Sequence, residues 1–201
     1  ELPAAQRLKE LAQKFGIKSW KAAPPKRSDL GQRPPLDSLG PLHWSPPAAP
    51  TWSAFDFDGQ TVTNGATPGG AQWLVFYLGS DCTHCVEQLN ALAKQAQDFA
   101  KLGIALHAIS PQSPKTAPQI HDKLPELKDP KAIHFLCDPS LDAFKAFRAH
   151  DDFENEALHA VVLLDGSRRI RWMDISYQPF TDVGFLVKEA RRLLAIDPAA
   201  P

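Results

Sequence analysis

The sequence has few of the features that would assign it to several large classes of protein. Its formal net charge is −1 over 201 residues, so no basic excess favours a nucleic acid or an anionic membrane surface. No apolar run approaches the ~20 residues that cross a bilayer. It contains three cysteines, too few for the multiple-disulfide framework of small secreted domains. Hydrophobic residues make up 43% of the chain, which fits one globular domain with a substantial core.

Proline is plentiful but unevenly distributed. Residues 1–50 hold nine of the nineteen prolines, including three Pro-Pro pairs that forbid regular helix and favour extended backbone. Ahead of these pairs, apolar residues recur at helical spacing and predict one helix over residues 4–15. We therefore divide the chain into a Pro-rich arm or linker, residues 1–50, and a folded domain, residues 51–201.

The domain sequence alternates between strand-like and helix-like patterns. Residues 55–62 alternate around Asp58-Gly59 and predict an N-terminal hairpin. Asp138 and Thr181 are the predicted N-caps of two helices, the first running to about His150. The order favours an α/β fold, a central mixed sheet flanked by helices. The remaining predicted strands are residues 73–78, 104–109, 132–136, 160–164 and 169–173, and the remaining predicted helices are residues 85–101 and 115–124.

Cys82 and Cys85 are the residues with the clearest chemical potential. They follow the predicted strand 73–78 and precede an amphipathic segment, which places the first cysteine at a helix start. Unpaired backbone N–H groups and the positive end of the helix dipole there stabilise thiolate, the reactive form of cysteine. His84 adds an imidazole that can carry positive charge beside the thiols. The pair can close into a disulfide without large backbone movement, so we predict thiol redox chemistry.

Other interpretations of the cysteines stay open at this point. The pair could be a static disulfide, or half of a zinc site, although structural zinc takes four ligands and no second pair stands at ligand spacing. A redox-inert recognition domain is a further alternative, but it would not need both thiols. Cys137 is either a small buried hydrophobic residue or a third thiol that resolves a sulfenic acid on Cys85.

The segment from Phe76 to Cys85 resembles the active-site segment of the redoxins, the alkyl hydroperoxide reductase/thiol-specific antioxidant or peroxiredoxin-like family of the thioredoxin superfamily. In that family an aromatic pair leads to proline, then Thr or Ser, then the peroxidatic cysteine. On this alignment Cys85 holds the peroxidatic position, Cys82 replaces Thr or Ser, and Leu78 replaces the proline. The resemblance covers residues of about 50–196 and implies a thioredoxin fold.

The same segment is similar to thioredoxin-like reductases, in which Cys82 would attack and Cys85 would resolve. Residues 158–165 resemble the thioredoxin segment in which a cis-proline precedes a strand, and His159 takes the place of that proline. Peroxiredoxins carry an arginine at this point. The resemblance implies that His159 faces the thiols and supplies a cation or a proton. Cys82, Cys85, His84 and His159 are therefore the predicted catalytic residues, with no cofactor and no metal.

The predicted function is thiol–disulfide exchange of the redoxin type, with thiol-dependent peroxidase (antioxidant) activity left open. The alternative is copper handling, because some thioredoxin-fold copper chaperones use two cysteines and a distal His, a set that Cys82, Cys85 and His159 imitate. Those chaperones space their cysteines by three residues rather than two.

The expected partners follow from this chemistry. They are protein or small-molecule disulfides and thiols, hydroperoxides and a thiol reductant; nucleic acid is not expected, and a second copy of the chain is a candidate. The Pro-rich arm predicts a domain that is part of a longer or anchored protein. We expect it outside the cytoplasm, in a bacterial periplasm or at a cell surface.

Overall fold

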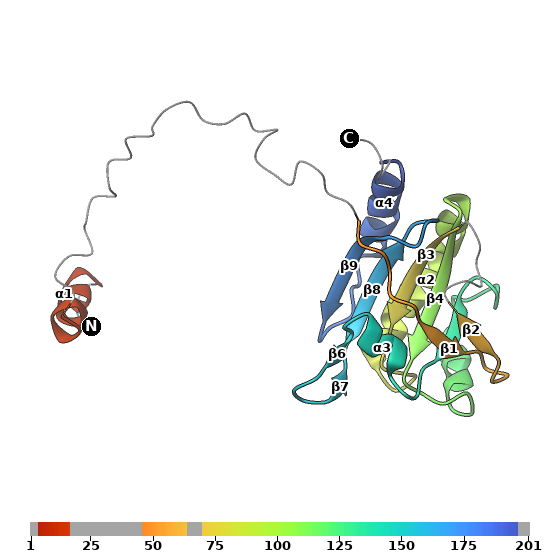
Figure 1. Ribbon diagram of the computed structural model, residues 1–201, viewed down its shortest axis with the longest axis horizontal. Helices are drawn as coiled ribbons and strands as arrows, with labels where there is room; N and C mark the ends of the chain where they lie inside the picture. The colour runs from red at the N-terminus through yellow and green to blue at the C-terminus, as the bar shows by residue number, and fades with distance from the viewer. Residues whose placement is uncertain (1–3, 17–45, 64–69, 197–201) are drawn as a thin grey trace. The chain divides into compact units, whose positions relative to one another are not determined.

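The computed structural model describes residues 4–16, 46–63 and 70–196 (Figure 1). The chain divides into two units, residues 1–43 and residues 44–201, and each is described by itself. The first unit contains helix α1, Ala4–Lys14, which confirms the helix predicted there. Two of the Pro-Pro pairs lie outside the described residues. None of the helices in the described ranges is both long and apolar enough to cross a membrane.

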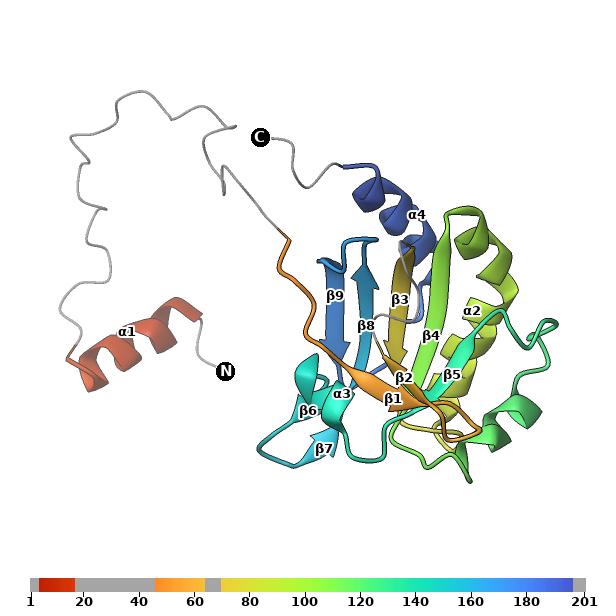
Figure 2. The same ribbon diagram turned by 45° about the vertical axis from the view of Figure 1, so that its right-hand side comes forward.

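The second unit is built on a seven-stranded mixed sheet with strand order β2-β1-β5-β4-β3-β8-β9 (Figure 2). Strands β3, β4 and β5 run parallel, whereas β8 and β9 on one side and β1 and β2 on the other are added antiparallel. The predicted N-terminal hairpin is therefore confirmed. The bounds are β1 Ser53–Phe55, β2 Thr61–Thr63, β3 Ala71–Phe76, β4 Ile104–Ser110, β5 His134–Cys137, β8 His159–Leu164 and β9 Ile170–Ser176.

Helices cover both faces of the sheet, as the predicted fold class requires. Alternate side chains of β3 point to opposite faces, so Trp73 joins one apolar core and Leu74 joins the other. The first core includes residues of α2, Thr83–Lys101, of α4, Val183–Leu194, and of the 3₁₀ helix Ala117–Lys123. The second core is smaller and contains residues of α3, Asp142–Ala146. The chain is thus a central mixed sheet between helical layers.

The helix predicted from Asp138 to about His150 is wrong in its extent. Helix α3 ends at Ala146, and His150 already belongs to strand β6, His150–Asp151, which pairs with β7, Glu156–Ala157. Leu141 at the N-cap position and Arg148 beyond the C-cap both have φ near +60°, a conformation that cannot continue a right-handed helix. The short hairpin β6–β7 was not predicted.

Two N-cap predictions also need correction. Asp138 is not the residue directly before α3, yet its buried carboxylate accepts backbone N–H groups from Asp142, Ala143 and Phe144. Helix α4 is capped by Asp182, whose side chain accepts from Phe185 N at 2.9 Å, and not by Thr181. In both cases a carboxylate binds the positive end of a helix, as the dipole favours.

We predict that Asp138→Ala lowers the free energy of unfolding by ~2–3 kcal/mol, because three backbone N–H groups, two of them buried, lose their acceptor. Urea unfolding followed by circular dichroism measures the change. Asp142→Ala is the matched control, since the exposed Asp142 side chain accepts only from the Ser140 hydroxyl and from no backbone group that is described. Equal losses in the two variants would contradict this account of α3.

Candidate functional site

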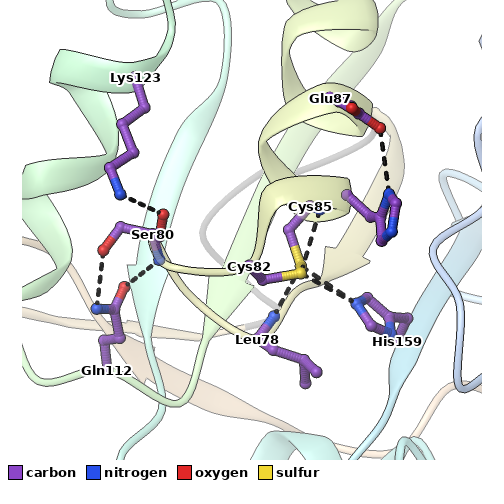
Figure 3. The surroundings of a disulfide bond; sticks show 9 residues. Leu78, Ser80, Cys82, Cys85, Glu87, Gln112, Lys123 and His159 are labelled. Atoms are coloured by element: carbon purple, nitrogen blue, oxygen red, sulfur yellow. Dashed lines mark hydrogen bonds and ion pairs between the residues drawn. A yellow bond between two sulfur atoms is a disulfide. The ribbon is translucent and has the colours of Figure 1, made fainter.

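Cys82 and Cys85 are joined by a disulfide at the start of α2 (Figure 3). Their Cα atoms lie 5.2 Å apart. Cys82 is the N-cap of the helix, and its Sγ accepts a hydrogen bond from Cys85 N at 3.2 Å. The prediction that the first cysteine stands at a helix start is therefore confirmed. A negative sulfur at this position is stabilised by the backbone N–H group and by the helix dipole.

The two sulfur-bearing residues differ in their access to solvent. Cys82 is half-buried, whereas Cys85 is 0% exposed and belongs to the core that contains Tyr77 and Leu89. The Cys85 sulfur also accepts the backbone N–H of Leu78 at 3.5 Å. A large substrate can therefore reach the first cysteine but not the second.

His159 lies against the disulfide (Figure 3). Its Nε2 is 3.1 Å from Cys85 Sγ and 3.7 Å from Cys82 Sγ. The antiparallel pairing of β3 with β8 brings it there, because Phe76 pairs with Ala160 and the chain beyond Phe76 leads into the cysteine loop. The peptide bonds of the described residues are trans, so the histidine occupies this place without a cis bond.

Burial lowers the pKa of His159 below 6.5, an effect that the backbone of Tyr177 and Ser176 opposes and the nearby charge of His84 reinforces. The imidazole is therefore neutral near pH 7, and a neutral imidazole can accept a proton. With Nε2 beside the buried sulfur, His159 is placed to take the proton of the Cys85 thiol when the pair is reduced.

His84 does not face the sulfur atoms, although it stands between the two cysteines in the sequence. Its side chain is 66% exposed, and Nδ1 lies 3.2 Å from Glu87 Oε2. Asp81, the acidic neighbour of Cys82, is 93% exposed and pairs with Lys123 at 3.3 Å. The structure thus brings together Cys82, Cys85 and His159, and the catalytic role of His84 stays a prediction.

Three residues that the sequence analysis missed hold the loop before Cys82. Gln112 accepts the backbone N–H of Ser80 and donates to its hydroxyl, and the ammonium of Lys123 donates to the Ser80 carbonyl at 2.8 Å. Gly79 has φ of 119°, and a Cβ there would lie 2.9 Å from the Gln112 side chain. Spacing gave no signal for these contacts, because more than thirty residues separate Gln112 and Lys123 from Ser80.

Cys137 is buried and free at the end of β5. Burial, together with a smaller contribution from the charge of Asp56, raises the pKa of its thiol to about 11. Such a thiol carries little thiolate at neutral pH and is a poor nucleophile. The structure therefore favours the interpretation of Cys137 as a small buried residue.

The rim beside His159 is acidic. Hairpin β6–β7 and its turn, residues 150–157, contain four Asp or Glu and no Lys or Arg, and Phe153 in the turn is 96% exposed. Tyr177, two residues beyond the residue that pairs with Ala160, donates its hydroxyl to Asp151 at 2.7 Å. This contact ties the acidic hairpin to the strand end next to His159.

Cys82, Cys85 and His159 have the donor set of a small metal site. One ligand atom each from Cys82, Cys85 and His159 can be chosen so that all lie within 4.8 Å of one another. Within the described ranges this is the one group of three or more such side chains so arranged. Two thiolates and an imidazole suit a soft or borderline ion, but both sulfur atoms are occupied by the disulfide.

Comparison with known proteins gives a consistent result. The profile of the AhpC/TSA family matches residues 47–173, well over half of the chain. A comparison with curated protein sequences found no match. Among solved structures, AhpC of Mycobacterium tuberculosis is 15% identical, with a TM-score of 0.65 over 77% of this chain and 95% of that one.

Two further structures have the same fold. A reduced 2-Cys peroxiredoxin of Plasmodium vivax is 20% identical, with a TM-score of 0.60 over 73% of this chain and 93% of its own. AhpC of Enterococcus faecalis is 14% identical, with a TM-score of 0.63 over 75% of this chain and 92% of its own. At these identities the likeness concerns the fold, which is the thioredoxin fold predicted from the sequence.

We predict that His159→Phe lowers the rate of exchange with a small uncharged disulfide ~10²-fold, since the variant lacks the proton acceptor. In the native chain the rate should fall on acidification only below pH 6.5, because a lowered pKa keeps the imidazole neutral down to that pH. Stopped-flow rates between pH 4.5 and 8 measure both effects.

His84→Ala is the comparison variant for this experiment. It should keep the acid limb of the rate profile, because His84 contacts Glu87 and not the sulfur atoms. We expect its removal to lower the reduction potential of the pair only slightly, because the lost charge is exposed and screened. If the acid limb were lost in His84→Ala and kept in His159→Phe, the assignment of the proton acceptor would be wrong.

Proposed function

This chain belongs to the AhpC/TSA family and is a thiol-dependent oxidoreductase of the redoxin type, and from that premise we propose that its cysteine pair reduces disulfides with Cys82 as the attacking thiolate. The observation that carries the proposal is the difference in exposure, since Cys82 is half-buried and Cys85 is 0% exposed. A sulfur atom of a bulky substrate can approach only the first of the two.

In the first step the Cys82 thiolate attacks one sulfur of the substrate disulfide. A bond forms between Cys82 and that sulfur, the substrate S–S bond breaks, and the other substrate sulfur leaves as a thiolate. The N-cap position favours this step, because the backbone N–H of Cys85 and the helix dipole stabilise the attacking thiolate.

In the second step Cys85 releases the bound substrate. Its thiol gives a proton to His159 Nε2, and the resulting thiolate attacks Cys82 Sγ. The Cys82–Cys85 disulfide forms, and the remaining substrate sulfur leaves as a thiolate that takes the proton from His159. Two electrons have then passed from the pair to the substrate, and an external thiol reductant must restore the dithiol.

Peroxide reduction is the second candidate, and the surroundings of Cys85 favour it. In that scheme Cys85 gives its proton to His159, and the resulting thiolate attacks a peroxide oxygen. The O–O bond breaks, Cys85 becomes a sulfenic acid, and the other oxygen takes the proton from His159 and leaves as water or an alcohol. Cys82 then condenses with it, releasing water and closing the disulfide. Leu78 N–H and His159 are placed to stabilise the Cys85 thiolate, but the residue is fully buried.

Single-cysteine variants separate the two schemes, and we predict that the disulfide scheme holds. Cys85→Ser should form a stable mixed disulfide with a small disulfide through Cys82, whereas Cys82→Ser should react at least ~10²-fold more slowly because its thiol is buried. Mass spectrometry of quenched samples measures both adducts.

The same variants test the peroxide scheme. After treatment with hydrogen peroxide and dimedone, we expect little sulfenic acid in either protein. Rapid, stoichiometric labelling at Cys85 in Cys82→Ser would overturn the preference and make the chain a working peroxidase. Because the chain belongs to the AhpC/TSA family, copper handling, the alternative function considered from the sequence, is not favoured.

We infer that cationic disulfides are better substrates than anionic ones, because the acidic hairpin β6–β7 adjoins His159. At low salt we predict that cationic cystamine reacts fastest, uncharged hydroxyethyl disulfide more slowly and anionic oxidised glutathione slowest, with a several-fold spread between the rates. The spread should shrink as added salt screens the charges of hairpin β6–β7. Glu154→Gln with Glu156→Gln should compress the spread. Asp58→Asn with Asp98→Asn removes the same charge elsewhere and should leave it unchanged; equal compression would contradict the role of the hairpin.

We also propose that the domain works outside the cytoplasm, tethered by its Pro-rich segment to a longer or anchored protein, with a second copy of the chain as a candidate partner. The Pro-rich segment ahead of the domain supports this proposal, because Pro-rich segments act as semi-rigid spacers between a domain and what it is attached to. Labelling of the reduced pair in intact cells by a membrane-impermeant maleimide tests the compartment, and protection until the cells are lysed would refute it.

A further inference from the structure

A pocket of about 370 Å³ lies between hairpin β1–β2 and strand β5. In the described residues, strand β1 pairs with β5 at Phe55 and Cys137, and the pocket is lined by Val62 of β2 and by His134, Phe135 and Leu136 of β5. Neither cysteine of the disulfide nor His159 lines it. The residues that line it include His107, His121, His134, Asp56, Phe57 and Phe135.

His107 is the unexplained residue of this pocket. Its side chain is 5% exposed, and neither ring nitrogen has a hydrogen-bond partner. Buried polar groups in folded proteins are nearly always paired, so an unpaired imidazole on a pocket wall needs a reason. Its neighbour on the next parallel strand is His134, in direct register, and the two ring centroids are 5.1 Å apart.

We propose that His107 and His134 together bind one divalent transition-metal ion, which reaches them through this pocket. A metal–nitrogen bond of ~2.0–2.1 Å puts each ring centroid ~3.2 Å from the ion, so two rings at a tetrahedral angle lie ~5.2 Å apart. The two ring centroids are 5.1 Å apart, but the rings are nearly stacked, with 26° between their planes, so the exposed His134 ring has to turn about its side-chain bonds before its nitrogen points at an ion on His107. Imidazole nitrogens suit zinc, nickel and copper ions, which is the class of ligand this pair would take.

The two histidines differ in ways that suit successive roles in binding. His134 is exposed at the pocket and can meet an ion first, whereas His107 is buried beside it. Burial, together with a smaller contribution from His134, lowers the pKa of His107 to about 4, so its ring needs to lose no proton at neutral pH before it binds.

The remaining positions of the ion would be open. Within the described parts of the chain, no third His, Cys, Asp or Glu completes a tight group with these two rings. The pocket has room for water or a small anion in the open positions, and Asp56 on its wall offers a carboxylate to bound water. Such a two-histidine site is independent of the proposed thiol chemistry.

Nickel(II) titration by calorimetry at pH 7 tests the proposal. The oxidised full chain is used, so that both sulfur atoms of the pair are held in the disulfide. We expect one site that is lost, or at least tenfold weaker, in both His107→Phe and His134→Phe. The control is His121→Phe, which changes a ring of the same pocket that packs on Phe57 and Phe135 and should leave the affinity unchanged.

Two further measurements keep the proposal falsifiable. If His107→Phe unfolds the protein, His134→Asn replaces it, because His134 is exposed. Copper(II) electron paramagnetic resonance should show two coupled nitrogens in the native chain and fewer in His134→Asn. Binding that survives His134→Asn and disappears in His159→Phe would place the ion at the disulfide and overturn the proposal. So would equal weakening by His121→Phe.

Discussion

The antiparallel pairing of β3 with β8 is the constraint on which the rest of the site depends. It carries the end of β3 into the cysteine loop and sets His159 3.1 Å from Cys85 Sγ. Both strands are buried along nearly their whole length, so a slip by one residue would turn their apolar side chains to the wrong faces. The packing of the cores thus also fixes the one imidazole that touches the disulfide. The fold and the reactive geometry share one cause.

Much of this fold could be predicted from the sequence because its strands are continuous apolar runs and its main helix starts at a cysteine pair. The errors lie where local signals conflict with tertiary structure. The backbone at Leu141 and Arg148 adopts positive φ, which no composition rule anticipates for these residues, so the helix after Asp138 is short. At Thr181 and Asp182 two good N-caps are adjacent, and sequence alone gives no ground for choosing between them.

The candidate site, too, could be predicted from the sequence only in part. The position of Cys82 as a helix N-cap follows from the order of strand, loop and helix, and the position of His159 followed only from a family resemblance. The orientation of His84 could not be predicted, because a residue in the first turn of a helix can face either the sulfur atoms or a carboxylate three residues on, and here it contacts Glu87. The clamp of Gln112 and Lys123 on Ser80 depends on the three-dimensional approach of distant segments.

The complete burial of Cys85 has a consequence for competition between thiols. Once a substrate is bound to Cys82, any free thiol in solution could in principle displace it, at a rate set by its concentration. Cys85 meets the same sulfur from within one helical turn, at an effective concentration that the fold fixes and that dilution cannot change. Because foreign thiols cannot reach Cys85, they cannot divert it into a mixed disulfide of its own. The mixed disulfide between Cys82 and the substrate is therefore short-lived, whatever the concentration of free thiols around it.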